Sequence, residues 1–352
     1  MILLNPGPVT LSDRVRNSLS RPDLCHREEE FGQLQQSIRT NLLRVYNLSN
    51  ENWAPVLLTG SGTAAVEAML ISCIPEEGKA LVIENGVYGE RISEMLKSYD
   101  IHYDRHTHNW GADIDISSLR VMLSKKKYSH VVVVHHETTT GRLNELSKIS
   151  ELCASSGAKL LIDAVSSFGA EAIPFENGTI AACAATANKC LHGVPGTSFV
   201  LLSRPLFKDT MTPKRSVYLD LFKYLKAQDD KGTPFTQSVQ SFYALEEALK
   251  EFFDQGGRTS RYEVYSRRMA KISKALNSLK VRPFLPAKVN SVVLRSFLLP
   301  SDMTYDEVHK SLKNEGFIIY AGQSQYRDKL FRISLMGNLS PKNLADLELA
   351  LG

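Results

Sequence analysis

The strongest constraint on this 352-residue chain is an alternation, between about residues 55 and 205, of short strand-like runs with segments of helical periodicity. The strand-like runs are PVLLT, ALVIEN, IHYDRH, HVVVVHH, KLLIDAVSS, IAACAATA and TSFVLLS, and most of them are continuously apolar. Apolar strands separated by amphipathic helices are typical of a mostly parallel sheet that is covered on both faces. We therefore predict an α/β fold, in which ligands bind beyond the carboxyl ends of the strands.

A different pattern begins after Gly257. A long helical segment, RYEVYSRRMAKISKALNSL, precedes strand-like runs (NSVVLRSFLLP, FIIYAG, LFRISLMG) and two further helical segments (TYDEVHKSLKNEG, SPKNLADLELALG). This mixture predicts a compact α+β unit. We expect a large domain at residues 16–256, a smaller C-terminal domain at 257–352, and an N-terminal segment, 1–15, that packs with the small domain.

Composition and charge exclude several classes of protein. The chain is 43% hydrophobic and 23% charged, with a net charge of +4, which is ordinary for a globular protein and does not indicate a nucleic-acid surface. No apolar run reaches the length of a membrane span, and MILLNPGPVT lacks the features of a signal peptide, so we expect a cytoplasmic protein that does not bind membranes. Five cysteines without C-x-x-C spacing argue against a disulfide framework and a zinc site, and we expect each to be a small buried residue.

A glycine-rich junction, LLTGSGTAAVEA, connects the first apolar run to a helical segment. Backbone N–H groups of Ser61, Gly62 and Thr63 at such a junction suit a phosphate, although glycines here can also be purely structural. The same string fits G-x-G-x-x-A, and Glu84 in LVIEN stands roughly where a dinucleotide fold needs its ribose-binding acid. A nicotinamide or flavin enzyme therefore remains an alternative.

Two charged residues stand at the ends of apolar strands. Asp163 ends the apolar part of KLLIDAVSS, so it is either a structural group or a carboxylate that a cation keeps ionised. Lys189 stands among small residues in AATANKCLHGVPG; it could extend to the surface, but a desolvated lysine yields the neutral amine that attacks an aldehyde. Pyridoxal 5′-phosphate needs an anion site, an acid for its ring nitrogen and an amine for its aldehyde, and these parts occur here in that chain order with the lysine last.

Nine stretches spread over nearly the whole chain form a recognisable set: LLNPGPVT, PDLCHREEEFG, LLTGSGTAAVEA, NGVYGERI, HHETTTGRLNE, LIDAVSSFGA, ANKCLHGVPG, SVYLDL and FRISLMGNLS. In these stretches the chain resembles the class V (fold type I) aminotransferases, and among them the group that acts on 2-aminoethylphosphonate and pyruvate. The resemblance implies a seven-stranded domain that binds pyridoxal 5′-phosphate and a homodimer with shared active sites. It also implies a reversible ping-pong transfer of the amino group to pyruvate, which gives phosphonoacetaldehyde and alanine.

The resemblance also implies roles for individual residues. Lys189 is the Schiff-base lysine, and Asp163 is the partner of the pyridine nitrogen. The other cofactor-binding residues are Ser61, Gly62 and Thr63 at the phosphate, Tyr88 and Val165 on the two faces of the ring, Thr138 near the phenolic oxygen, Asn188, and Thr236, which reaches the phosphate from the other subunit. Arg332 is the residue that grips the acidic group of the substrate. We add Gly7 and Arg215 as substrate-binding candidates; Arg215, just before SVYLDL, would supply charge for a phosphonate dianion, although a solvated loop explains it nearly as well.

Two features depart from the family pattern and leave the substrate open. His136 stands in place of a small polar residue, and SLMGNL replaces a more usual GNIG-like string after Arg332. An alanine or serine to glyoxylate type of transaminase, with a different amino donor, is therefore an alternative. A nicotinamide-dependent enzyme and a non-catalytic binding protein are the others.

Overall fold

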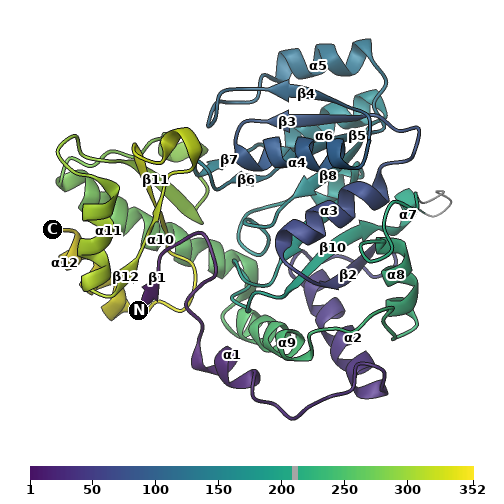
Figure 1. Ribbon diagram of the computed structural model, residues 1–352, viewed down its shortest axis with the longest axis horizontal. Coiled ribbons are helices and arrows are strands. Elements are labelled where there is room, and N and C mark those ends of the chain that lie inside the picture. Colours follow the sequence, from purple (N-terminus) through teal and green to yellow (C-terminus); the bar gives the residue numbers. More distant parts are fainter. Residues whose placement is uncertain (208–212) are drawn as a thin grey trace.

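The computed structural model describes residues 1–207 and 213–352. Its largest sheet has seven strands in the order β2-β10-β9-β8-β5-β3-β4 (Figure 1). The strands are β2 (Trp53–Thr59), β3 (Ala80–Glu84), β4 (Tyr103–Thr107), β5 (His130–Val134), β8 (Lys159–Asp163), β9 (Ile180–Thr186) and β10 (Thr197–Ser203). Strand β10 runs antiparallel to its neighbours β2 and β9, and the other neighbouring pairs are parallel. The prediction of a mostly parallel, seven-stranded α/β fold is confirmed.

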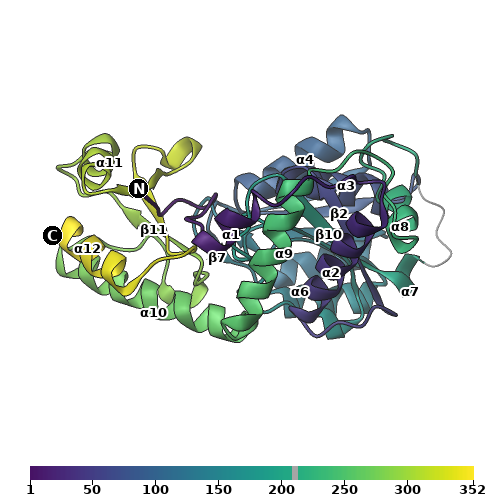
Figure 2. The ribbon, with the colours of Figure 1, turned by 90° about the horizontal axis from the view of Figure 1, so that it is seen from below.

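Helices cover both faces of this sheet (Figures 1 and 2). In strand β5, Val131 and Val133 belong to one apolar core, whereas Val132 and Val134 belong to the other. Successive side chains of a strand point to opposite faces, and burial on both faces is why these strands are continuously apolar. The first core includes α2 (Glu29–Arg44), α5 (Ile116–Lys125), α6 (Leu146–Ser156) and α9 (Val239–Asp254), and the second includes α3 (Gly62–Cys73), α4 (Val87–Ser98) and α8 (Leu221–Asp229).

The C-terminal part of the chain has a sheet and a core of its own. Strands β11 (Leu294–Leu298), β14 (Leu330–Ser334) and β13 (Tyr320–Ala321) form an antiparallel sheet in that order. Helices α10 (Gly257–Ser278), α11 (Tyr305–Asn314) and α12 (Pro341–Leu351) accompany it, and Figure 2 shows this unit beside the larger one. Strand β1 (Ile2–Leu3) pairs with β12 (Phe317–Ile318), so the start of the chain is held by this unit. The domain bounds given above stay a prediction.

The remaining elements are short: α1 (Asp13–Ser18), α7 (Arg204–Phe207), a hairpin of β6 (His136–Glu137) and β7 (Arg142–Leu143), and the 3-10 turns η1 (Phe175–Asn177), η2 (Ala287–Val289) and η3 (Ser324–Tyr326). Helices α1, α2 and α8 were not among the predicted elements. The periodic signal for α2 was present, because Phe31, Leu34, Ile38 and Leu42 recur at helical spacing and are all buried.

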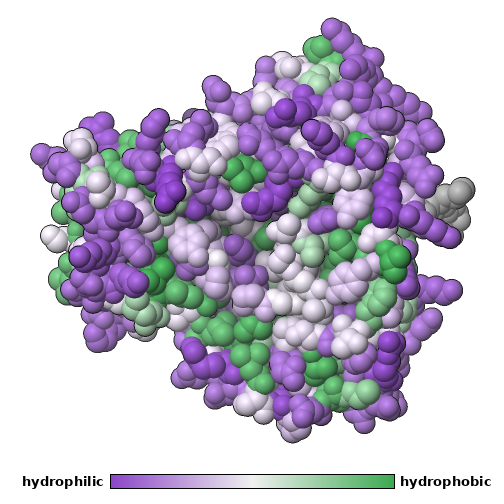
Figure 3. All heavy atoms as spheres, viewed as in Figure 1, coloured by the Kyte–Doolittle hydropathy of each residue, from purple (hydrophilic) through white to green (hydrophobic). Residues whose placement is uncertain are grey.

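Hydrophilic residues cover most of the face shown in Figure 3, with smaller hydrophobic patches among them. Across the described parts of the chain, no helix has both the length and the apolar character that crossing a membrane requires. Four of the five cysteines are buried as expected, but Cys25 is exposed, so that expectation was wrong for this residue.

Candidate active site

Lys189 lies in the turn that follows β9. The turn is closed by a hydrogen bond from the Gly193 N–H to the Ala187 carbonyl, at 2.8 Å. The Nζ atom of Lys189 donates to the Pro6 carbonyl, and a Cβ built on Gly7 would lie 2.6 Å from the lysine Cδ. Burial lowers the pKa of Lys189 to about 8. A much larger fraction of this amine is therefore neutral at neutral pH than in an exposed lysine.

Asp163 is the last residue of β8, the strand beside β9, so the two charged residues meet at the same edge of the sheet. The carboxylate accepts a hydrogen bond from the Val165 N–H at 2.9 Å. Burial raises the pKa of Asp163 to about 6, although the charges of Arg91 and Lys189 oppose that rise. A buried carboxylate with so little compensation is suited to a cationic ligand.

Asp163 and Lys189 line one cavity, which has a volume of about 240 Å³. A second cavity of similar size, about 280 Å³, also contains Asp163. The first is lined by Tyr88, Val134, His136, Thr138, Asp163, Val165, Ser166 and Lys189. The second is lined by Thr63, Val66, Tyr88, Arg91, Ile92, Met95, Asp163 and Val165.

The second cavity reaches the N-terminus of α3. Ser61 is the N-cap residue, but its side chain makes no capping bond, and the described residues supply no hydrogen-bond acceptor for the N–H groups of Gly62 and Thr63. These free donors, together with the helix dipole, suit an anion. A larger residue would not fit at Gly62, because its Cβ would lie 2.7 Å from a methyl carbon of Val165.

Tyr88 is held by a capping carboxylate that comes from another part of the chain. It lies in the first turn of α4, where Glu137 accepts hydrogen bonds from the N–H groups of Gly89 at 2.8 Å and Tyr88 at 3.3 Å. Burial, helped by the charge of Asp163, raises the pKa of Glu137 to about 7. The guanidinium of Arg91 lies over the Tyr88 ring, 4.8 Å from its centroid. The aromatic side chain is thus fixed in position at the cavity wall.

Arg332 lies in β14 and is joined to the cavity through Thr138. Its Nη1 donates to the Thr138 carbonyl at 2.9 Å and to Oε1 of Gln323 at 3.1 Å, and its Nε donates to the Ala321 carbonyl at 2.8 Å. Within the described chain Nη2 has no hydrogen-bond partner. The guanidinium is therefore held rigidly with one donor group left for an anion.

Three other candidate residues, Arg215, Thr236 and Asn188, line neither of the two cavities. The structure does not bring Arg215 to the cavity: its guanidinium donates to the carbonyls of Ile71, Ile74 and Pro75, at the C-terminal end of α3. Those carbonyls lack partners inside the helix, and an arginine satisfies them well. Thr236 is exposed, and Asn188, one residue before Lys189, accepts a hydrogen bond from Thr186 at 2.8 Å.

Glu84, which the nicotinamide alternative requires as a ribose ligand, is already engaged. Its carboxylate pairs with Arg105, with Nη2 to Oε2 at 2.6 Å, and accepts hydrogen bonds from Ser93 and Thr107. It is 1% exposed. A carboxylate committed to this network is not available to a ribose, so the structure speaks against that alternative.

Three groups at the site were not predicted from the sequence: Arg91, Glu137 and the Pro6 carbonyl. Arg91 is one turn after Tyr88 on the same helix, so helical spacing could have indicated it. Glu137 and Pro6 act through contacts between segments far apart in the chain, for which one sequence offers no signal.

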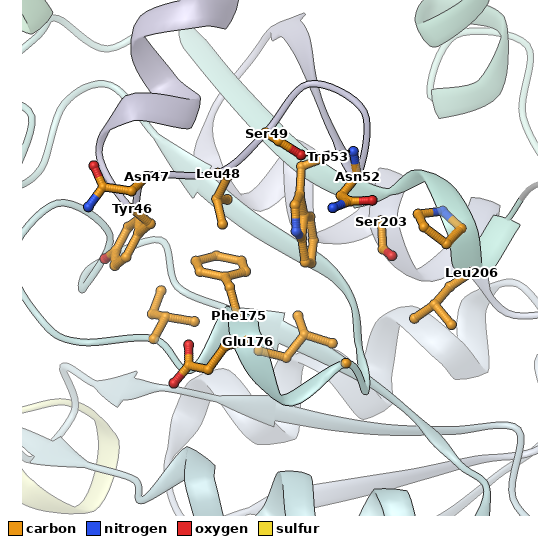
Figure 4. Close-up of a pocket in the computed structure, with 14 residues that line it drawn as sticks. Tyr46, Asn47, Leu48, Ser49, Asn52, Trp53, Phe175, Glu176, Ser203 and Leu206 are labelled. Carbon is orange, nitrogen blue, oxygen red and sulfur yellow. Dashed lines mark hydrogen bonds between the residues drawn. The ribbon is translucent and has the colours of Figure 1, made fainter.

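A larger hollow, of about 1100 Å³, lies at the other end of the strands, away from Lys189. Figure 4 shows the residues that line it. Trp53 begins β2, and its ring lies 4.9 Å from that of Phe175 in the wall of this hollow. It contains none of the candidate site residues. In parallel sheets of this kind ligands bind at the carboxyl ends of the strands, which is the edge of Lys189.

The comparison with protein families agrees with this geometry. A family described as aminotransferase class V matches residues 12–343. The chain belongs to the class V aminotransferases. The family and its transaminase relatives make this chain a transaminase, and the class implies pyridoxal 5′-phosphate as the cofactor.

Individual relatives cover almost the whole chain. A 2-aminoethylphosphonate–pyruvate transaminase of Vibrio cholerae is 32% identical over 98% of this chain and 95% of that protein. Among solved structures, an aspartate aminotransferase of Thermus thermophilus has a TM-score of 0.90 at 26% identity, covering 100% of this chain and 99% of that one. An alanine–glyoxylate aminotransferase of Nostoc sp. has a TM-score of 0.92 at 24% identity, covering 99% and 94%, and shows the fold alone.

Proposed function

We propose that this chain uses pyridoxal 5′-phosphate to move the amino group of 2-aminoethylphosphonate to pyruvate, which gives phosphonoacetaldehyde and alanine. The observation that carries the proposal is the meeting of Lys189 and Asp163 in one cavity, at the edge where this fold binds ligands. The reaction is reversible, so either direction is chemically open.

The residues present fit the cofactor. The free N–H groups of Gly62 and Thr63 suit its phosphate. Asp163, whose burial disfavours an unpaired charge, suits a protonated ring nitrogen. Tyr88 and Val165 line both cavities, as residues on the two faces of a flat ring would. When bound, pyridoxal 5′-phosphate supplies an aldehyde that holds an amino group and a ring that accepts electrons.

Lys189 has two tasks in this scheme. Its amine would hold the aldehyde of the bound cofactor, with loss of water, and the lowered pKa favours the neutral form that can do so. When it is not bound to the cofactor, the same amine would act as the general base and acid that moves a proton at the substrate carbon. Asp163 would keep the ring nitrogen of the bound cofactor protonated, and Thr138 lines the same cavity as Lys189.

Arg332 is the candidate for the acidic group of either substrate. Its rigid guanidinium with a free Nη2 can bind a phosphonate in one half-reaction and a carboxylate in the other. Gly7 lies against Lys189 and would border the substrate. The assignment of 2-aminoethylphosphonate is supported by the V. cholerae relative, a 2-aminoethylphosphonate–pyruvate transaminase.

A homodimer is part of the proposal. Thr236 is exposed in the single chain, as expected for a residue that serves the phosphate site of a second subunit.

A screen of donors and acceptors with the purified protein tests the proposal. Pyruvate and 2-aminoethylphosphonate should give alanine, and omission of either should give none. Alanine formation from an amino-acid donor but not from 2-aminoethylphosphonate would favour the alternative class of transaminase. Analytical ultracentrifugation tests the dimer separately.

A further inference from the structure

His136 is a buried imidazole with one unpartnered nitrogen at the Lys189 cavity. It starts β6, just after the carboxyl end of β5, and is 1% exposed. Its Nε2 atom is buried and has no hydrogen-bond partner among the described residues, and the residue lines the cavity with Lys189 and Asp163. Buried polar atoms are nearly always paired, so this one is expected to pair with a group that moves into the cavity.

The contacts of the other ring nitrogen fix the tautomer. The Ser166 hydroxyl donates to the His136 carbonyl at 2.9 Å and lies 3.0 Å from Nδ1. A hydroxyl has one proton, so both contacts are hydrogen bonds only if Nδ1 carries a proton and donates to Oγ. Burial lowers the pKa of His136 to about 3, which keeps the ring neutral. Nε2 therefore has a free lone pair and is an acceptor.

The donor that fits is the amine in the same cavity wall. We propose that Nε2 of His136 accepts a hydrogen bond from the nitrogen of Lys189 when that nitrogen leaves the Pro6 carbonyl to hold the cofactor. His136 is then a positioning residue of the transaminase. This inference rests on the proposed use of pyridoxal 5′-phosphate.

Several titratable groups lie near His136 and Lys189. The hydrogen bond to Nε2 of His136 would add to their effects on the pKa of the lysine nitrogen. Asp163 raises and Arg332 lowers the pKa of Lys189, and Cys190 beside it also raises that pKa. His135 is the other titratable group beside His136, and burial lowers its pKa to about 3, so it is neutral as well. A neutral acceptor stabilises the protonated nitrogen, so it raises the pH at which the lysine-bound cofactor loses its proton.

The test is a pH titration of the absorbance of the protein loaded with pyridoxal 5′-phosphate. His136→Asn keeps a group near Ser166 but removes the acceptor at the Nε2 position, whereas His136→Gln places an amide oxygen close to that position. His135→Asn is the matched control, because His135 is equally buried, contacts Ser167 at 3.0 Å and is not part of the cavity lining.

We expect the midpoint of this absorbance titration to fall by about half a pH unit to one unit in His136→Asn, because the variant lacks one hydrogen bond to the protonated nitrogen. It should stay near the wild-type value in His136→Gln and His135→Asn. An unchanged midpoint in His136→Asn, or an equal fall in His135→Asn, would overturn the proposal. If the wild type shows no lysine-bound cofactor at all, the proposed function fails instead.

A second measurement does not depend on the folding of the His136 variants. The ¹⁵N resonance of the His136 Nε2 is followed while pyridoxal 5′-phosphate is added to the wild type and to Lys189→Ala. A change toward a hydrogen-bonded acceptor in the wild type alone supports the proposal. The same change in Lys189→Ala assigns the donor to the cofactor and contradicts it.

Discussion

Gly7 lies directly against the side chain of Lys189. A Cβ at Gly7 would lie 2.8 Å from Nζ and 2.6 Å from Cδ, and the backbone φ of Gly7 is +118°. The N-terminal segment is held in this position because β1 pairs with β12 and the Leu4 carbonyl accepts a hydrogen bond from the Ser334 N–H at 2.7 Å. A segment from the start of the chain therefore forms part of the wall around the reactive amine.

Gly7→Ala is expected to displace the lysine and slow cofactor capture by about tenfold or more, which corresponds to ~1.4 kcal/mol. Gly157→Ala is the control, because Gly157 also has a positive φ but nothing within 4 Å of its added Cβ. Both variants should lose about 1–2 kcal/mol of stability from backbone strain. Only Gly7→Ala should slow the change in absorbance that follows addition of pyridoxal 5′-phosphate; equal rates in the two variants would refute the contact.

Asp163→Asn should stabilise the cofactor-free protein at high pH. The folded-state pKa of Asp163, about 6, lies above its ordinary value of 3.8, so the folded state binds more protons between these values. Stability therefore falls as pH rises from about 4 to about 6, by about 2–3 kcal/mol, and the asparagine removes that loss. Thermal unfolding of both proteins at pH 4 and pH 8 measures the difference, which should be small at pH 4. A larger advantage for the variant at pH 4 than at pH 8 would contradict this sign.

Glu137→Ala should weaken cofactor binding through Tyr88. The variant loses the acceptor for the first turn of α4, at a cost of about 1–2 kcal/mol in stability, and frees the helix that carries the aromatic ring. Asp115→Ala removes the N-cap of α5, whose side chain accepts from the Ser118 N–H, at a distance from the cavity. Equilibrium dialysis with pyridoxal 5′-phosphate should show weaker binding for Glu137→Ala alone.

Arg332→Lys should raise KM for both substrates about 10- to 100-fold, because a lysine loses the planar, charge-assisted hydrogen bonds. Arg215→Lys is a useful contrast, since Arg215 holds the end of α3 instead of the cavity. That variant should lower the unfolding temperature and leave KM unchanged. A rise in KM for Arg215→Lys would show that Arg215 does contribute to substrate binding.

The sequence predicted the parts of the site that depend on strand ends. Asp163 ends one largely apolar strand and Lys189 follows the next, and neighbouring parallel strands bring their carboxyl ends together. The glycine turn before α3 was equally readable. The fold class followed from the alternation of strand-like runs and helical segments, because strands that are buried on both faces are continuously apolar.

What escaped prediction depends on contacts between distant segments. The Glu137 carboxylate caps a helix that begins fifty residues earlier in the chain, and the Pro6 carbonyl contacts Lys189 across almost two hundred. Arg215 carries charge that looked available in the sequence, yet three backbone carbonyls use it. Glu84 also looked available in the sequence, as a ribose ligand, yet its carboxylate is paired with Arg105.

The most direct test of the account is to load the purified protein with pyridoxal 5′-phosphate, reduce it with borohydride, digest it and locate the modified lysine by mass spectrometry. The account predicts that the reduced cofactor is attached to Lys189, and that Lys189→Ala carries none. Attachment to a different lysine, or no attachment in the wild type, would contradict it.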